Sequence, residues 1–205
     1  VSITERQQRE KALIREKIVN AATELFSQHG FEQVSMRKIA EKIEYSPTTI
    51  YNYFKNKNEL LFVLLKQGYT KFFDTLKDAK EKYNNAAYEI KLKKVLQSYI
   101  EFGLTNQDYY NLMFILNIDN DDSLVGCENE RWKAFEQLVL LVQEGKEIDF
   151  FQTSDEMLTS QIIWAKLHGI TSLLITSAHF PWAEKELLID TYLDSLIAGV
   201  KKGSF

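Results

Sequence analysis

The chain has few of the residues that interrupt or cross-link a fold. Its 205 residues include one cysteine, two prolines and eight glycines. A single cysteine cannot form an intrachain disulfide, which excludes a disulfide-stabilised framework and fits a reducing compartment. Because so few prolines and glycines are present, few segments are broken, and this composition favours long helices.

Long apolar runs are also absent. No stretch approaches the roughly 20 apolar residues that a membrane-spanning helix needs. The N-terminal stretch VSITERQQREKALIREK contains no apolar signal core. We therefore expect no secretion and a cytoplasmic location.

Catalytic signatures are missing as well. The chain has three histidines and no nucleophile elbow, metal-spaced His/Cys set or glycine-rich phosphate loop. The acidic stretch Asp119 to Glu130 has the length of a calcium loop, but Leu124 occupies the sixth position, where such loops require glycine. We interpret Cys127, within this stretch, as an unremarkable thiol. We predict no enzyme activity, no catalytic residue, no metal site and no cofactor.

Charge is unevenly distributed along the chain. The net charge of −4 argues against a protein coated in nucleic acid. Val1–Lys57 contains ten Lys and Arg against seven Asp and Glu, a net of +3, so the remainder carries −7. This asymmetry fits a small phosphate-facing region on an acidic body.

Apolar residues recur at helical spacing along nearly the whole chain, without an internal repeat. This pattern predicts an all-α fold. Beyond the N-terminal region we expect helices over Lys57 to Tyr83, Ala87 to Thr105, Tyr109 to Leu116, Glu130 to Glu144 (ended by Gly145), Ser154 to Ser177 (capped by Ser154), and Pro181 to Val200.

The region from Gly30 to Leu61 is the most informative part of the chain. A first helix, over Thr4 to Gln28, stops at Gly30, whose missing side chain suits a helix end. Ser35 then fits an N-cap, because its hydroxyl can accept from an amide of the first turn. The apolar stripe of the helix that follows consists of Ile39, Ala40 and Ile43.

A tight turn from Glu44 to Ser46 separates this helix from the next. Ser46 fits a second N-cap, and the proline after it suits the first helical position. The helix Pro47 to Tyr53, with Ile50 and Phe54 directed to the core, is too short to be stable alone. Two short helices joined in this way predict a helix-turn-helix.

At these residues the chain resembles the DNA-binding domain of TetR/AcrR-family transcriptional regulators. The resemblance is carried by Gly30-Phe31, Met36 to Ala40, Ser46, Ile50 to Phe54 and Lys57 to Leu61. It implies an N-terminal three-helix DNA-binding domain over residues 1–56 and a C-terminal helical domain over 57–205 that binds an effector and dimerises. The family usually has glycine where this chain has Glu44, so we expect a local adjustment there if φ is positive.

The resemblance and the chemistry of the side chains together assign DNA contacts. Thr48, Thr49 and Asn52 can offer hydroxyl, methyl and amide groups to base edges in the major groove. Phosphate contacts, which fix register, are expected from Tyr51, Tyr53, Lys55 and Lys57, and from Ser35 and Arg37 at the preceding helix. Ser46 and Pro47 complete the predicted set; Ser46 acts first as a cap.

The C-terminal part carries a second, shorter resemblance. Trp164, His168 and Gly169 resemble the Trp-x-x-x-His-Gly signature of the WHG-type C-terminal domain of one TetR branch. Helical spacing places Trp164 and His168 on one face. Gly169 costs about 1 kcal/mol against alanine within a helix, so we expect another helix to approach it closely. His168 is interpreted either as a hydrogen-bonded core histidine or as part of an effector pocket.

These observations predict a ligand-released repressor that binds a palindromic operator as a homodimer through its last two helices. The effector is expected to be an apolar or aromatic small molecule. The candidate pocket residues are Tyr99, Phe102, Tyr109, Met113, Phe114, Trp132, Phe135, Trp164 and His168. A DNA-binding regulator without a small-molecule effector, controlled by a protein partner or by its own concentration, is the alternative.

Overall fold

The computed structural model describes residues 3–115 and 128–203. These residues form helices and one isolated β-bridge, between Phe151 and Lys201. The prediction of an all-α fold is confirmed. The acidic stretch before Glu128 and Cys127 lie outside the described residues.

The chain divides into two compact units. The first holds described residues 3–68, 108–115 and 128, and the second holds 69–107 and 129–203. Helix α4 (Lys57–Lys82) begins in the first unit and ends in the second. The two units are defined by how the helices pack, so they do not test the predicted boundary between a DNA-binding domain and an effector-binding domain at residue 56. That boundary stays a prediction.

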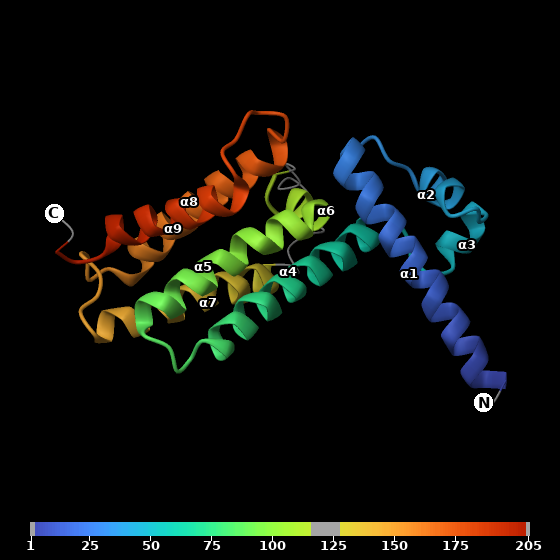
Figure 1. Ribbon diagram of the computed structural model, residues 1–205. Coiled ribbons are helices and arrows are strands. Elements are labelled where there is room, and N and C mark those ends of the chain that lie inside the picture. Colours follow the sequence, from blue (N-terminus) through green and yellow to red (C-terminus); the bar gives the residue numbers. More distant parts are fainter. Residues whose placement is uncertain (1–2, 116–127, 204–205) are drawn as a thin grey trace. The chain divides into compact units, whose positions relative to one another are not determined.

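In the first unit, α1 (Ile3–His29), α2 (Met36–Lys42) and α3 (Pro47–Tyr51) pack with the start of α4 (Figure 1). Each helix contributes apolar residues of its inner face to one core. Ile18, Phe26, Ile39, Ile50, Phe54, Leu60, Leu61 and Leu64 are at most 1% exposed. The helix-turn-helix predicted from the sequence is therefore present, although α3 ends two residues before the expected Tyr53.

The same unit contains α6 (Gln107–Tyr110) from Asp108 onward and the π-helical segment η1 (Asn111–Ile115). The expected helix start at Tyr109 is wrong, because the break after α5 is confined to Asn106, whose side-chain amide donates to the Phe102 carbonyl at 3.0 Å. The side-chain amide of Asn111 donates to the Ser27 hydroxyl at 3.1 Å, which ties η1 to α1.

In the second unit, α5 (Tyr88–Thr105) packs against α8 (Glu156–Thr176) and α9 (Lys185–Val200), with α7 (Glu128–Glu147) and the end of α4 completing the bundle. Figure 1 shows α5 running beside α8 and α9. The core of this unit contains many aliphatic side chains that are at most 2% exposed: Leu92, Leu96, Ile100, Leu141, Ile163, Leu167, Leu193 and Leu196.

A cluster of charged side chains joins three helices of this unit. Lys80 of α4 and Lys91 of α5 lie 2.6 Å and 2.5 Å from the two carboxylate oxygens of Glu144 on α7. Burial by itself would raise the pKa of Glu144, but hydrogen bonds from both lysines bring it below its usual value. Lys91 is 5% exposed, so its charge depends on this partner.

Three expected helix boundaries are wrong. Gly145 lies inside α7, which ends at Glu147 and is closed by the left-handed residue Asp149. The Tyr88 hydroxyl and the Phe151 ring occupy the space that a side chain at Gly145 would fill. The N-cap of α8 is Asp155, whose carboxylate accepts from the Leu158 amide at 2.9 Å, not Ser154. Helix α9 starts at Lys185, four residues beyond the proposed Pro181 start, because the Glu184 carboxylate caps it and accepts from the Leu187 amide at 2.7 Å.

No helix formed by the described residues is long and apolar enough to cross a membrane.

Candidate nucleic-acid interface

The turn between α2 and α3 sets the angle of the short helix. The Ser35 hydroxyl accepts from the Lys38 amide at 3.2 Å and opens α2, as predicted. At the other end, the Tyr45 amide donates to the Ala40 carbonyl at 3.0 Å and the Glu44 amide to the Glu41 carbonyl at 3.2 Å. These two bonds form a Schellman motif, which requires a left-handed residue at its centre.

Glu44 occupies that left-handed position, with φ of 59°. From the sequence we expected a local adjustment at Glu44, without loss of the motif, if its φ was positive. Both hydrogen bonds of the turn are formed. The second non-glycine residue with positive φ in the described chain, Asp149 (φ 56°), closes an equivalent motif after α7. Both positions therefore carry backbone strain that glycine would relieve.

Glu44→Gly is expected to stabilise the first unit by about 1 kcal/mol, because glycine adopts this φ without the Cβ–carbonyl clash. Glu44→Ala is the matched control, since it removes the charge but keeps the clash. Thermal unfolding of both variants measures the difference. Equal stability of the two would show that the glutamate side chain, and not the backbone, sets the cost.

Helix α3 is held by caps and by one buried side chain. The Ser46 hydroxyl accepts from the Thr49 amide at 3.2 Å and lies 3.0 Å from the Thr49 hydroxyl. Ile50 is fully buried. A five-residue helix cannot persist alone, so these contacts and the neighbouring helices determine its conformation.

The remaining α3 side chains form an outer face. Thr48, Tyr51 and Asn52 are exposed, Tyr51 to 54%, whereas Thr49 and Tyr53 are half-buried. The structure thus brings hydroxyl, phenol and amide groups together on one short helix. These groups are suited to hydrogen-bond base edges and phosphate oxygens.

Lys57, predicted as a phosphate contact, has a role inside the unit. Its ammonium donates to the Phe31 carbonyl at 2.8 Å and lies 4.0 Å from the Phe31 ring centroid. Phe31 packs edge-on against Phe26 of α1, with 5.3 Å between centroids. Lys57 therefore holds the loop after α1 onto the start of α4, a contact that sequence spacing did not predict.

The start of α4 contains a cap that sequence reasoning missed. The Asn56 side chain accepts from the Glu59 amide at 2.8 Å, and the Glu59 carboxylate accepts from the Lys55 amide at 2.6 Å. An Asn followed three residues later by Glu is the available sequence signal. The Lys55 side chain is exposed, next to this fixed backbone.

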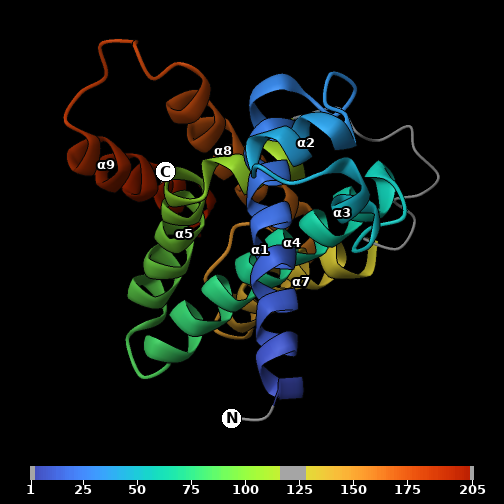
Figure 2. The ribbon, with the colours of Figure 1, turned by 90° about the vertical axis from the view of Figure 1, so that its right-hand side faces the viewer.

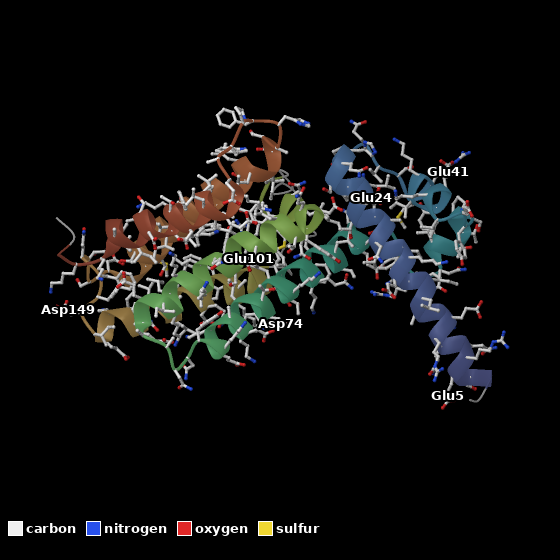
Figure 3. The ribbon with its side chains drawn as sticks, viewed as in Figure 1. Glu5, Glu24, Glu41, Asp74, Glu101 and Asp149 are labelled. Atoms are coloured by element: carbon white, nitrogen blue, oxygen red, sulfur yellow. The ribbon has the colours of Figure 1, made fainter. Side chains whose placement is uncertain are left out.

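The α2 face presents cations that are only lightly engaged. Arg37 pairs with Glu41 at 2.9 Å, but both side chains are highly exposed, at 80% and 61%. Such a pair contributes little to stability, so a phosphate can replace the carboxylate at small cost. Figure 3 labels Glu41 on α2 and Glu24 on α1. Glu24 pairs with Lys42 of α2 at 2.8 Å.

The predicted effector-pocket residues are split between the two units. Tyr109, Met113 and Phe114 belong to the first unit, and the other six belong to the second. In the first, the Tyr109 hydroxyl donates to Gln67 at 3.3 Å, and the Met113 and Tyr109 side chains close over Gly68 of α4.

In the second unit these residues form two aromatic groups. Tyr99 and Phe102 are buried against Phe72, with ring centroids 5.1 Å and 4.9 Å away. Phe135 links Trp132, which is 51% exposed, to Trp164. Half-burial lowers the pKa of His168, one turn beyond Trp164, which favours a neutral imidazole. The pocket assignment stays a prediction.

Gly169 does not have the neighbour expected from the sequence. Apart from the adjacent residues and the backbone of its own helix, a side-chain carbon at this position would meet no atom of the described chain within 4 Å. The expectation that another helix of the same chain packs closely against Gly169 is therefore wrong.

Residues 18–64 match the family model described as bacterial regulatory proteins, tetR family. These residues cover the helix-turn-helix and the parts of α1 and α4 that support it. The chain therefore contains a tetR-type helix-turn-helix DNA-binding domain.

The relatives of this chain are similar to it over different lengths. It is 24% identical to the uncharacterized HTH-type transcriptional regulator YobS of Bacillus subtilis over 168 residues, 81% of each chain. It is 33% identical to the fatty acid metabolism regulator protein of the same organism over 104 residues, 50% of each chain. The chain spans about half the length of most curated relatives it matches. These relatives are named as regulators.

A solved structure extends the similarity in fold. The fatty acid degradation regulator FadR of Bacillus halodurans superposes with a TM-score of 0.74 at 23% identity, covering 90% of this chain and 95% of that one. At this identity the comparison shows a shared fold.

Proposed function

We propose that this protein is a transcriptional repressor of the TetR type that binds a palindromic operator as a homodimer and is released by a small-molecule effector. The observation that carries the DNA-reading part is the outer face of α3, where Thr48, Tyr51 and Asn52 are exposed on a helix fixed by its caps. In the proposed complex α3 lies in the major groove. Thr48, Thr49 and Asn52 face base edges, and Tyr51, Tyr53, Lys55, Lys57, Ser35 and Arg37 contact phosphates.

Lys57 contributes differently from the exposed residues. One of its three donors is used by the Phe31 carbonyl, which leaves two for a phosphate. Substitution of Lys57 therefore mixes loss of folding stability with loss of a phosphate contact. Tyr51 and Thr48 are cleaner probes of the proposed interface.

The proposed homodimer uses the outer faces of α8 and α9. On α8, an exposed or half-exposed stripe recurs at helical spacing and consists of Leu158, Ile162, Ala165, Gly169, Leu173 and Thr176. Leu158 is 46% and Leu173 49% exposed in the single chain, and Leu187 on α9 is 62% exposed. The open space at Gly169 lies within this stripe. A second copy packing here would cover these apolar side chains and approach Gly169 closely.

The effector is proposed to bind the aromatic residues of the helical bundle. Release requires that it bind the DNA-incompetent state more tightly than the competent one, because equal affinity shifts no population. Two similar proteins are named as regulators of fatty acid metabolism or degradation. Fatty acids therefore belong in the first set of apolar compounds to be tested.

The deciding experiment is selection of random duplexes by the purified full chain, followed by titration of the selected duplex at two salt concentrations. We expect a palindrome whose affinity falls steeply with salt. A folded sample that enriches no sequence would refute the DNA-reading assignment. Failure of every apolar compound to release the duplex would favour the alternative, a regulator controlled by a protein partner.

On the selected duplex, Thr48→Ala and Tyr51→Phe are expected to act differently. Loss of a base contact at Thr48 should reduce discrimination at one position of each half-site by about 1–3 kcal/mol. Loss of the Tyr51 hydroxyl should weaken binding to every sequence to a similar extent, because a phosphate contact carries no sequence information. Binding to the operator and to single-base variants measures both effects. Uniform weakening by Thr48→Ala would exclude a base contact.

A further inference from the structure

The turn between α2 and α3 contains a carboxylate that is unfavourable for the fold. Glu44 is exposed, and its φ of 59° is a conformation that glycine adopts at lower cost. It also follows directly after Ile43, the C-cap of α2. The negative end of the helix dipole lies there, so a negative side chain is disfavoured at this position. Glycine would satisfy the local structure better on both counts.

No cation of α2 compensates the charge of Glu44. The three basic side chains of this helix all have other partners: Arg37 pairs with Glu41, Lys42 pairs with Glu24, and the Lys38 ammonium donates to the Gln33 carbonyl. Among residues 3–115 and 128–203, the Glu44 carboxylate has no ion pair and no side-chain hydrogen bond. Its charge is therefore available to act on a molecule outside the chain.

Glu44 is close to the helix that is proposed to read DNA. It lies two residues before Ser46, the N-cap of α3, so their Cα atoms are at most about 7 Å apart. A glutamate side chain spans about 4 Å more, which keeps the carboxylate within about 11 Å of this cap in any rotamer. The Debye length is about 10 Å at 0.1 M salt. Because the N-terminal end of α3 is the end nearest the base edges in the proposed complex, bound DNA experiences this charge.

The turn is also fixed in position beside α1. Helix α1 passes α3 at two cation–aromatic contacts. The Lys17 ammonium lies 6.0 Å from the ring centroid of Tyr45, in the turn, and the Arg15 guanidinium lies 5.0 Å from that of Phe54, which follows α3. Figures 1 and 2 show α2 and α3 beside α1 from two directions. Glu44 is thus carried by a packed unit, and its charge stays next to α3.

We propose that Glu44 is an electrostatic attenuator of DNA binding: its carboxylate repels the phosphates of DNA bound at α3 and lowers the affinity for every sequence. This inference rests on the proposed DNA-binding function of α3. Residues 1–57 carry a net charge of +3, from ten basic and seven acidic side chains, which would be +4 without this carboxylate. One charge is therefore a substantial part of the attraction between this region and DNA.

Attenuation suits a regulator that must be released from its operator. Nonspecific sites are in large excess in a genome, and sequence-independent attraction sets how strongly they compete. An effector can weaken DNA binding only by its coupling free energy, which is typically equivalent to about 5–150-fold in affinity. A fixed repulsive charge beside α3 keeps the operator affinity low enough for a change of this size to release the protein.

The test compares Glu44→Gln with Asp149→Asn in the full chain. Both substitutions remove a carboxylate from a left-handed residue, at φ of 59° and 56°, but Asp149 belongs to the second unit, to which no DNA contact is assigned. At about 0.1 M salt we expect Glu44→Gln to bind the selected duplex and an unrelated duplex each about three- to tenfold more tightly. Asp149→Asn should change neither affinity by more than about twofold, since its exposed pair with Lys202 contributes little.

Two further variants separate the charge from the backbone conformation. Glu44→Gly removes both the charge and the backbone strain, whereas Glu44→Asp keeps the charge. We expect Glu44→Gly to gain as much affinity as Glu44→Gln, and Glu44→Asp to bind like the wild type. The gains should shrink as salt is raised towards 1 M, where the Debye length is about 3 Å. Circular dichroism melting confirms that each variant folds.

Unchanged affinity of Glu44→Gln would overturn the proposal, because the charge would then not act on DNA. Weaker binding would also overturn it, since the carboxylate would then make a favourable contact, for example with an amino group of a base. A gain in Glu44→Gly alone would assign the effect to the backbone and would equally disprove attenuation by charge.

These outcomes differ from failure of the proposed function. A wild-type protein that binds its selected palindrome, with a Glu44→Gln variant that binds no more tightly, disproves the attenuator alone. A wild-type protein that enriches no duplex refutes the DNA-reading role of α3, and the role of Glu44 with it.

Discussion

Leu173→Glu is expected to turn the protein into a monomer that binds the two-half-site duplex at least about a hundredfold more weakly. Leu173 is apolar, 49% exposed and lies toward the C-terminal end of the exposed stripe on α8 (the α8 stripe). In a two-fold symmetric interface the substitution occurs twice. Each carboxylate would be removed from water without a partner, which costs about 3–5 kcal/mol for an uncompensated buried charge.

Leu140→Glu is the matched control. Leu140 is also an exposed leucine within a helix of the same unit, at 39% exposure, but it lies on α7. Light scattering with size-exclusion chromatography measures the mass of each variant, and binding to the selected duplex measures the consequence. Unchanged mass and affinity for Leu173→Glu would show that the α8 stripe is not the dimer interface.

Gly145→Ala is expected to destabilise the second unit by about 2 kcal/mol or more, because the added carbon overfills a packed site. It would overlap the Tyr88 hydroxyl and the edge of the Phe151 ring. Neither group can move freely. The Tyr88 hydroxyl donates to the Leu141 carbonyl at 2.8 Å, and its ring packs edge-on against Phe150, with 4.9 Å between centroids.

The protonation of Tyr88 makes this arrangement independent of pH in the physiological range. Burial, and then the negative charge of Glu144, raise the pKa of the Tyr88 phenol well above its usual value. The hydroxyl therefore keeps its proton and its hydrogen bond. Glycine at position 145 is the residue that leaves room for it.

Gly199→Ala is the control for the intrinsic effect of the substitution. Gly199 lies in α9, and an added carbon there would be 3.4 Å from the flexible end of Lys166. Alanine is preferred to glycine within a helix by about 1 kcal/mol, so this variant should be neutral or more stable. Chemical denaturation of both variants provides the comparison. A Gly145→Ala protein as stable as Gly199→Ala would mean that Tyr88 and Phe151 can repack.

Local signals in the sequence were sufficient to predict the helix-turn-helix. The Ser35 and Ser46 caps and the proline after Ser46 act over three or four residues, so their outcome depends little on the rest of the chain. The same holds for Glu44, whose left-handed conformation follows from the local geometry of a Schellman turn.

Contacts between distant residues could not be predicted in this way. Lys57 reaches the Phe31 carbonyl across 26 residues, and Gly145 meets Tyr88 across 57, so no local pattern records either contact. Gly169 gives the opposite case, because a glycine expected to face a neighbouring helix faces open space in the single chain.

The sequence by itself determined the all-α class, the helix-turn-helix and the residues of the α3 face, because periodicity, capping and turn geometry are properties of neighbouring residues. Only the tertiary structure decided that Lys57 is engaged within its own unit and that the predicted pocket residues divide between two units. It also decided that α1 passes α3 at Arg15 and Lys17. These features depend on which surfaces pack together, and side-chain burial over the whole fold determines that choice.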